Sequence, residues 1–183
     1  PNVLPIIAKN IAEGLIQRFS QTNNPVNVIA CENMIGGSTL LKEKVLEHIP
    51  EEQKSMIESL VGFPDAAVDR IVPNQTNEDL LTVAVEPYYE WVVEKPAIKG
   101  EVPTINGITY VDELTAYIER KLFTVNTGHA AAAYLGQKFN YETIEQAIQD
   151  SEIRQVLEGT LKETGDVLIE QYQFDRETHD QYR

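Results

Sequence analysis

The stretch VNVIACENMIGGS at residues 26–38 decides the fold of the first half of the chain. Its first five residues are mostly apolar, which is typical of a short buried strand. Two glycines and Ser38 follow, and this combination favours a turn in which the serine caps the next helix. The stretch therefore predicts a strand, a turn and a helix in that order.

Helical patterns lie on both sides of this stretch. Apolar residues recur at helical spacing over residues 3–19, and the same spacing returns over residues 39–48. A third helix is expected to begin after Pro50 and to end before Gly62. An alternation of helix, strand and helix is α/β in character.

Strand patterns continue towards the middle of the chain. Residues 67–72 and 81–86 read as two strands, and residues 88–95 continue in an extended conformation. Residues 99–107 contain two glycines and one proline, which makes this segment the candidate domain boundary.

The pattern changes beyond that boundary. Residues 112–134, 141–149 and 152–172 are all helix-like, and no convincing strand is found among them. We therefore expect an α+β protein in which residues 1–100 form an α/β domain and residues 101–183 form a mainly helical domain.

Charge and cysteine content narrow the class of function. The 29 acidic and 15 basic residues give a net charge of -14, which disfavours nucleic acid and anionic membrane as partners. No apolar run approaches the roughly 18 residues of a membrane span, and no signal peptide opens the chain, so we expect a cytoplasmic protein. Cys31 is the single cysteine, and we expect it to be a small buried hydrophobe, not a nucleophile.

Three polar side chains are predicted to share the apolar face of one helix. On a regular α-helix, Lys121, His129 and Asn126 fall at roughly 0°, 80° and 140°. The same arc holds apolar residues, whereas Arg120 is expected to point elsewhere. Burial would cost each polar group several kcal/mol unless it found a partner, so the trio suggests a purpose.

Such a trio could transfer a proton. Desolvation lowers the pKa of a lysine, so that a buried Lys121 could accept the proton of a substrate hydroxyl. Asn126 and His129 could then hold the oxygen as it becomes a carbonyl. The structural alternatives are a lysine whose amine reaches solvent and a histidine that is merely a satisfied core residue.

The spacing K-x4-N-x2-H of this trio resembles the signature of the polyol-specific long-chain dehydrogenases and reductases. The surrounding YIERKLFTVNTGHA at residues 117–130 is most similar to the branch of that family that acts on mannitol 1-phosphate. Three further elements resemble the family in the correct order: CEN at residues 31–33, FPDAAVDRIVP at 63–73 and EPYYEWVV at 86–93.

The resemblance implies a role for each member of the trio. Lys121 is expected to be the general base, and Asn126 and His129 to bind and polarise the reacting oxygen. Asn33 is expected beside the reacting carbon and the nicotinamide of the cofactor NAD, although an Asx turn at a strand end would also explain it.

It also implies a substrate and two residues that would bind it. Asp69 and Arg70 are expected to bind the substrate, although a simple ion pair between them is an open alternative. The implied reaction interconverts mannitol 1-phosphate and fructose 6-phosphate by hydride transfer. The phosphate ligands stay open among Arg70, Arg120, Lys95 and Lys99.

The resemblance also implies that part of the family's architecture is absent. There is no glycine-rich G-x-G-x-x-G turn, and the chain begins at Pro1 without an initiator methionine. We therefore expect a central fragment, in which a remnant of a Rossmann-type cofactor domain precedes a truncated helical substrate domain. The fragment alone should be inactive.

Metal ligands and rival functions were considered as well. The three histidines are far apart and no zinc-type spacing is present, so we expect metal-independent chemistry. The rival interpretations are a sibling dehydrogenase for free mannitol or a hexuronate, and a helical binding module without catalysis. A fragment that binds a sugar phosphate without turning it over is a third. The sequence does not determine an oligomeric state.

Overall fold

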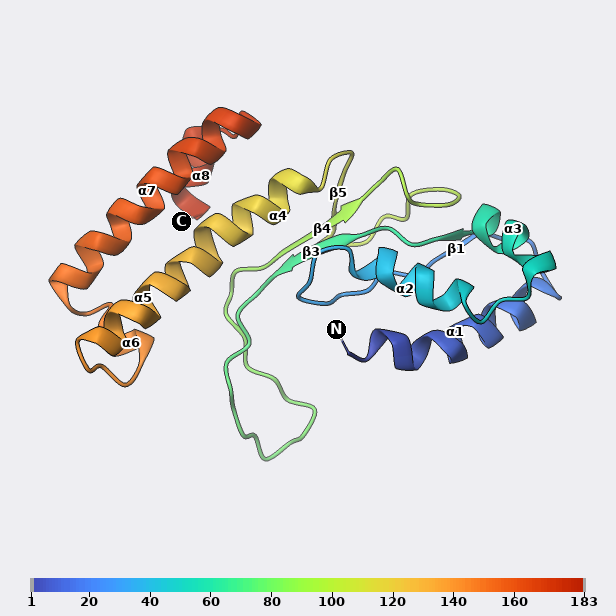
Figure 1. Cartoon of the computed structure of the whole chain (residues 1–183), viewed down its shortest axis with the longest axis horizontal. Helices are drawn as coiled ribbons and strands as arrows, with labels where there is room; N and C mark the ends of the chain where they lie inside the picture. The colour runs from blue at the N-terminus through green and yellow to red at the C-terminus, as the bar shows by residue number, and fades with distance from the viewer. Residues whose placement is uncertain (1, 183) are drawn as a thin grey trace. The chain divides into compact units, whose positions relative to one another are not determined.

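The computed structural model describes residues 2–182, and the chain divides into two compact units (Figure 1). Unit 1 ends at Leu114 and unit 2 begins at Thr115. Unit 1 combines helices and strands, whereas unit 2 is entirely helical in its described residues. The predicted α+β class is therefore confirmed.

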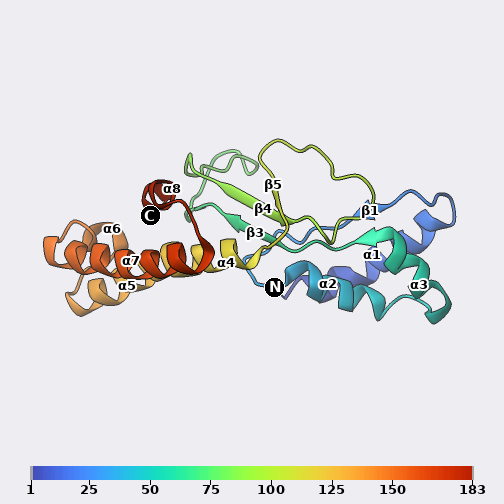
Figure 2. The same ribbon diagram turned by 90° about the horizontal axis from the view of Figure 1, so that it is seen from above.

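Three helices build the core of unit 1: α1 (Leu4–Phe19), α2 (Gly37–Leu46) and α3 (Glu51–Leu60). Helices α1 and α2 lie side by side (Figures 1 and 2). Their apolar faces bury residues such as Ala8, Ala12 and Val45, each at 0% exposure. All three helices were predicted, because their apolar residues recur at helical spacing.

The cap of α2 differs from the prediction. Gly36, in the left-handed region at φ 70°, precedes the helix, and Ser38 lies within its first turn. The buried Ser38 hydroxyl instead accepts the Ala30 N–H at 2.9 Å. The Asp65 carboxylate caps α2 by accepting the N–H groups of Ser38 and Thr39 at 2.8 and 3.0 Å. The expected serine cap is therefore wrong, and a residue distant in sequence replaces it.

Two small sheets complete unit 1. The first pairs β1 (Val26–Asn27) with β2 (Val61–Gly62) in parallel. The second has the order β3-β4-β5 and contains β3 (Ala66–Asp69), β4 (Glu90–Glu94) and β5 (Thr109–Val111). Strand β4 pairs antiparallel with β3 and parallel with β5.

A side-chain clamp joins strand β1 of the parallel pair to the backbone at Lys99. The Asn27 amide donates to the Lys99 carbonyl at 3.0 Å and accepts the Lys99 N–H at 2.8 Å. This bidentate contact passes close over Gly62, where an added Cβ would lie 2.0 Å from the Asn27 Oδ1 atom and 2.6 Å from the Ala97 carbonyl oxygen. Gly62 is required here because only a missing side chain leaves room for the clamp.

One strand prediction fails in the middle of the chain, and one strand was not predicted. Residues 81–86 form no strand, and Leu80 and Leu81 are 94% and 90% exposed. This segment belongs to a long loop between β3 and β4 (Figure 1), whose turn is held by the Asp79 carboxylate. Conversely, β5 was not expected, because its three residues carry too short a pattern to be recognised.

Unit 2 is built around two long antiparallel helical segments. The first runs without a break through α4 (Thr115–Lys121), the π-helix η1 (Leu122–Asn126) and α5 (Thr127–Lys138). The short α6 (Ile144–Ala147) leads into the second, α7 (Ser151–Tyr172), and α8 (Arg176–Tyr182) follows. Helix α7 packs along α4, η1 and α5 (Figure 1).

Among residues 2–182, no helix is both long enough and apolar enough to cross a lipid bilayer.

Candidate active site

The trio predicted from the sequence lies around a π-helical turn. The backbone N–H of Thr127 donates to the carbonyl of Leu122, five residues earlier, where a regular α-helix would bond residues four apart. Lys121 ends the preceding helix, and Asn126 is the last residue of the π-helix. Short π-helical turns occur often at functional sites.

This turn changes the relative directions of the three side chains. An i→i+5 turn inserts about one extra residue and rotates everything downstream back by about 100°. The angular positions of Lys121, Asn126 and His129 change from about 0°, 140° and 80° to about 0°, 40° and −20°. The trio therefore lies within about 60° of arc, closer together than a regular helix would allow.

The same rotation defines which face is buried, and here the prediction was wrong. Arg120 and Thr124 are 6% and 3% exposed, whereas Lys121 is half-buried and Asn126 and His129 are exposed. A uniform 100° period placed Arg120 outward and the trio inward, because it could not include the π turn. The full burial predicted for Lys121 is therefore wrong.

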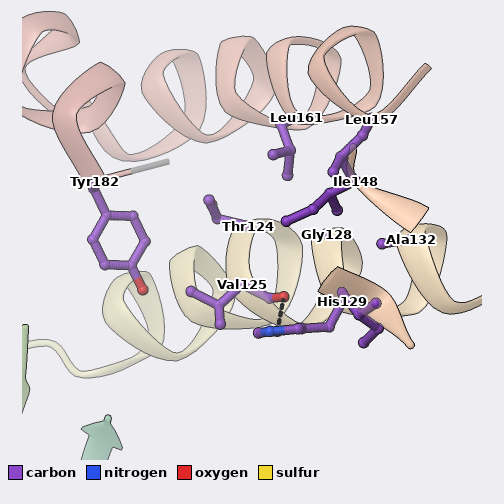
Figure 3. Close-up of a pocket in the computed structure, with 10 residues that line it drawn as sticks. Thr124, Val125, Gly128, His129, Ala132, Ile148, Leu157, Leu161 and Tyr182 are labelled. Atoms are coloured by element: carbon purple, nitrogen blue, oxygen red, sulfur yellow. Dashed lines mark hydrogen bonds between the residues drawn. The ribbon is translucent and has the colours of Figure 1, made fainter. Parts of the chain in front are cut away.

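His129 is held by its own helix. Its Nδ1 atom lies 3.0 Å from the Val125 carbonyl oxygen, as Figure 3 shows. A carbonyl can only accept, so Nδ1 carries the hydrogen. The Nε2 atom of the neutral ring is therefore an acceptor, and it becomes a donor only in the imidazolium form.

A cavity of about 240 Å³ adjoins this face within unit 2 (Figure 3). His129 and the buried Thr124 line it, and Thr124 Oγ1 makes no hydrogen bond among the described residues. The remaining wall is mostly apolar and includes Val125, Ile144, Ile148, Leu157 and Leu161. A polyol needs a partner for each buried hydroxyl, so this cavity does not suit the expected substrate.

Arg120 occupies an aromatic cage. Its guanidinium carbon lies 4.5 Å from the ring centroid of Tyr182, 4.9 Å from that of Phe174 and 5.0 Å from that of Tyr117. The fully buried His179 stacks on Phe174 at 6.3 Å. Arg120 thus ties α4 to the C-terminal helix α8, and a guanidinium so enclosed is not available to a substrate phosphate.

Asn33 and Cys31 follow the first strand of unit 1. Asn33 is exposed, in the irregular segment between β1 and α2. Cys31 is exposed as well, so its expected burial is wrong. Partial desolvation nevertheless raises the pKa of the Cys31 thiol, which keeps it protonated and disfavours it as a nucleophile.

Asp69 is the last residue of strand β3, and Arg70 follows it directly. Asp69 is 6% exposed and lies opposite Glu90 in the ladder, whereas Arg70 is exposed. The Arg70 guanidinium donates to the Glu86 carbonyl at 3.1 Å from Nη2 and lies 5.2 Å from the Tyr89 ring centroid. Glu86 also accepts the Ile71 N–H through its carboxylate, and this positioning role was not recognised from the sequence.

The first turn of α2 is a candidate site for the pyrophosphate of a dinucleotide. A helix that follows a strand can hold a phosphate with its free N–H groups. Here the Asp65 carboxylate already accepts the N–H groups of Ser38 and Thr39, and its second oxygen accepts the Thr39 hydroxyl at 2.6 Å. A second anion would face this carboxylate, so the turn does not fit a pyrophosphate.

Within residues 2–182, no group of three or more His, Cys, Asp or Glu side chains is arranged to hold a metal ion.

Two family models match the chain in succession. The mannitol dehydrogenase Rossmann domain matches residues 1–107, and the mannitol dehydrogenase C-terminal domain matches residues 113–183. Asn33, Asp69 and Arg70 fall in the first match, and the trio falls in the second. The family predicted from the four sequence elements is thereby confirmed.

Curated relatives cover the whole chain. Proteins named mannitol-1-phosphate 5-dehydrogenase from Oceanobacillus iheyensis, Bacillus pumilus and Bacillus subtilis are 60%, 56% and 53% identical over 182 residues. These matches cover 100% of this chain but only 47%, 48% and 48% of the relatives. The chain therefore spans about half the length of the curated relatives it matches.

Two solved structures share the fold. A substrate-free D-sorbitol dehydrogenase aligns with a TM-score of 0.74 at 23% identity, covering 88% of this chain and 39% of its own. Pseudomonas fluorescens mannitol 2-dehydrogenase, solved with NAD and D-mannitol, aligns with a TM-score of 0.64 at 25% identity, covering 81% and 33%. With both family models matched in order, the chain belongs to the mannitol dehydrogenase family, and a match to its Rossmann domain is followed by a match to its C-terminal domain.

Proposed function

We propose that this chain is the central part of an NAD-dependent dehydrogenase that interconverts mannitol 1-phosphate and fructose 6-phosphate. The observation that carries the proposal is the π turn between Lys121 and His129, within a match to the mannitol dehydrogenase C-terminal domain. Helix geometry around this turn brings Lys121, Asn126 and His129 within about 60° of arc. Relatives named for that reaction support this substrate, since three of them are 53–60% identical to the whole chain.

Lys121 is the general base of the proposed reaction. In the oxidation direction its neutral amine accepts the proton of the substrate hydroxyl. A hydride leaves the carbon that bears this hydroxyl, and that carbon becomes a carbonyl. In the reverse direction the ammonium returns that proton. NAD, when bound, supplies the hydride acceptor, and no metal is required.

Asn126 and His129 orient the reacting oxygen. The Asn126 amide can donate to the oxygen in both directions. His129 has its Nδ1 hydrogen engaged by Val125, so Nε2 is the ring atom that can contact the reacting oxygen, to which it donates in the imidazolium form.

The residues of unit 1 have complementary roles in this proposal. Asn33, exposed beyond β1, contacts the nicotinamide end of NAD and the reacting oxygen. Asp69 accepts a hydrogen bond from a polyol hydroxyl, and Arg70 binds substrate. The pyrophosphate is held outside this chain, because the α2 turn is already occupied by Asp65. Residues 1–100 would thus serve the cofactor and residues 101–183 the substrate.

The test uses a complete enzyme, defined as this chain in place of the matched 182 residues of its Bacillus subtilis relative. We expect this protein to reduce NAD with mannitol 1-phosphate and to oxidise NADH with fructose 6-phosphate. The 183-residue chain alone should show neither activity, because the proposal places the binding site for the NAD pyrophosphate outside this chain. Turnover by the chain alone would contradict the division of roles.

Parallel assays separate the rival functions. Faster turnover of free mannitol or a hexuronate than of mannitol 1-phosphate would favour a sibling dehydrogenase. A complete enzyme that binds no substrate and turns none over would favour a helical binding module. Calorimetry of the chain alone with fructose 6-phosphate tests whether it retains affinity without turnover.

A further inference from the structure

The carbonyl of Leu122 accepts two hydrogen bonds from one residue. The Thr127 backbone N–H is one donor, and the Thr127 hydroxyl is the other at 2.9 Å. Both contacts cross five residues, and Thr127 is half-buried. A carbonyl oxygen has two lone pairs, so both of its acceptor positions are filled by Thr127.

A regular helix in unit 2 provides the comparison. In α7 the Thr160 hydroxyl donates to the Val156 carbonyl, four residues earlier, also at 2.9 Å. This i−4 contact is the ordinary one for threonine in an α-helix. The Thr127 hydroxyl reaches i−5 instead, so its contact belongs to the π turn and would be lost if that turn became α-helical.

The competing α-helical arrangement would change the face that carries the trio. In it, the Asn126 N–H would bond the Leu122 carbonyl, and residues from Asn126 onward would rotate by about 100°. Lys121 precedes the turn and would not follow. The angular spread of Lys121, Asn126 and His129 would widen from about 60° to about 140°.

We propose that Thr127 is a positioning residue, whose hydroxyl holds the π turn and thereby keeps Asn126 and His129 on the same side of the helix as Lys121. The inference rests on the proposed function and deepens it. Thr127 itself touches neither substrate nor cofactor in this assignment. It acts through the backbone of Leu122.

Three variants of the complete enzyme test the inference. Thr127→Val removes the hydroxyl but keeps the branched shape, Thr127→Ser keeps the hydroxyl, and Thr160→Val removes a matched hydroxyl from a regular helix. We expect kcat/KM of Thr127→Val to fall by about tenfold to a hundredfold, since small misplacements of reacting groups have effects of this size. Thr127→Ser and Thr160→Val should stay within about twofold of the unmutated enzyme, because each leaves the turn intact.

A structural measurement accompanies the kinetics. Hydrogen exchange of the backbone amides at residues 122–128 should be faster in Thr127→Val than in Thr127→Ser, with the melting temperatures of the two variants close together. If Thr127→Val does not accumulate as folded protein, Thr127→Ala removes the same hydroxyl with less bulk and carries the same expectations.

Several outcomes would overturn the inference. They are an unchanged kcat/KM in Thr127→Val, an equal loss in Thr127→Ser, and an equal loss in Thr160→Val. Failure of the proposed function would look different, because the unmutated complete enzyme would then be inactive. In that case the exchange measurement alone would decide whether the Thr127 hydroxyl holds the turn.

Discussion

Arg120 and Lys121 are adjacent cations with opposite surroundings. Arg120 is 6% exposed and enclosed by the aromatic cage of Tyr117, Phe174 and Tyr182. Lys121 is half-buried on the face that it shares with Asn126 and His129. The buried cation therefore joins helices, and the more accessible cation is the one that could meet a substrate.

This contrast corrects a common argument. Burial of a polar group is often taken as the sign of function, yet the most enclosed cation here has aromatic partners that explain it structurally. Accessibility together with a shared direction is the better criterion at this helix. Four sets of variants test how Arg120 and Lys121 differ and how the helices around them are held, in order of decreasing expected effect.

Lys121→Met should remove activity and leave stability nearly unchanged. In the complete enzyme we expect kcat/KM to fall by about a hundredfold to ten-thousandfold, the range for loss of a general base. The melting temperature should change little, because Lys121 is only half-buried. Initial rates and a thermal melt of the same preparation check both parts. Near-normal turnover would remove Lys121 from the mechanism.

Arg120→Leu, unlike Lys121→Met, should lower the stability of the fold. Loss of three cation–π contacts, together with the packing of the Arg120 stem, should lower the free energy of unfolding by about 2–4 kcal/mol. Urea denaturation of the chain measures it. Arg176→Leu is the matched control, because Arg176 forms an exposed ion pair with Asp166 at 2.7 Å, and its loss should change the free energy of unfolding far less. Equal effects at the two arginines would remove the distinction between cage and surface.

Gly136→Ala should test whether the buried face continues beyond the π turn. Gly136 is buried on α5, and an added Cβ would lie 2.8 Å from the Ala147 Cβ atom. Such overpacking should cost about 1–3 kcal/mol. Gly159→Ala on α7 has nothing within 4 Å and should instead stabilise by about 0.5–1 kcal/mol. Urea denaturation of both variants measures the two changes in the free energy of unfolding. Two changes of the same sign would contradict a buried face that continues beyond the π turn.

Asp150 should give the smallest effect, and one that depends on pH. Hydrogen bonds from Tyr141 and from the backbone N–H groups of Glu152 and Ile153 lower the pKa of Asp150 below its ordinary 3.8. A lowered folded-state pKa means that the stabilisation is present above the unfolded-state pKa. It is lost as the pH falls through the folded-state pKa.

Asp150→Asn keeps a capping oxygen but cannot titrate. The loss of stability between about pH 5 and pH 2 should therefore be smaller in this variant than in the unmutated chain. Urea midpoints measured across that interval provide the check. Identical pH profiles would show that the carboxylate contributes nothing measurable.

Much of the fold follows from local pattern, and the exceptions have physical causes. Helices α1, α3 and α7 carry long periodic stretches and were predicted. Residues 81–86 have strand-like composition but lie in an exposed loop, because strand propensity needs a neighbouring strand to be realised. Helix α8 is short and was not expected.

The residues of the candidate site stay a prediction, whereas the burial expected for them was wrong. The spacing of Lys121, Asn126 and His129 identified one helix of the correct family. Their burial was predicted wrongly, because the prediction used one uniform helical period. Such a period cannot include the π turn, which the hydrogen bonds from Thr127 to Leu122 reveal. The positioning roles of Asp65 and Glu86 depend on contacts between distant residues, and nothing in their local sequence marked them.

The Asn27 clamp has a consequence for the order in which the chain folds. Its two hydrogen bonds join residues 72 positions apart, so the clamp beside the parallel strand pair closes only in a long-range encounter. During synthesis the ribosome must have released Lys99 before this contact can form. The pairing of β1 with β2 needs residues only as far as Gly62, whereas the clamp cannot form before Lys99 is available.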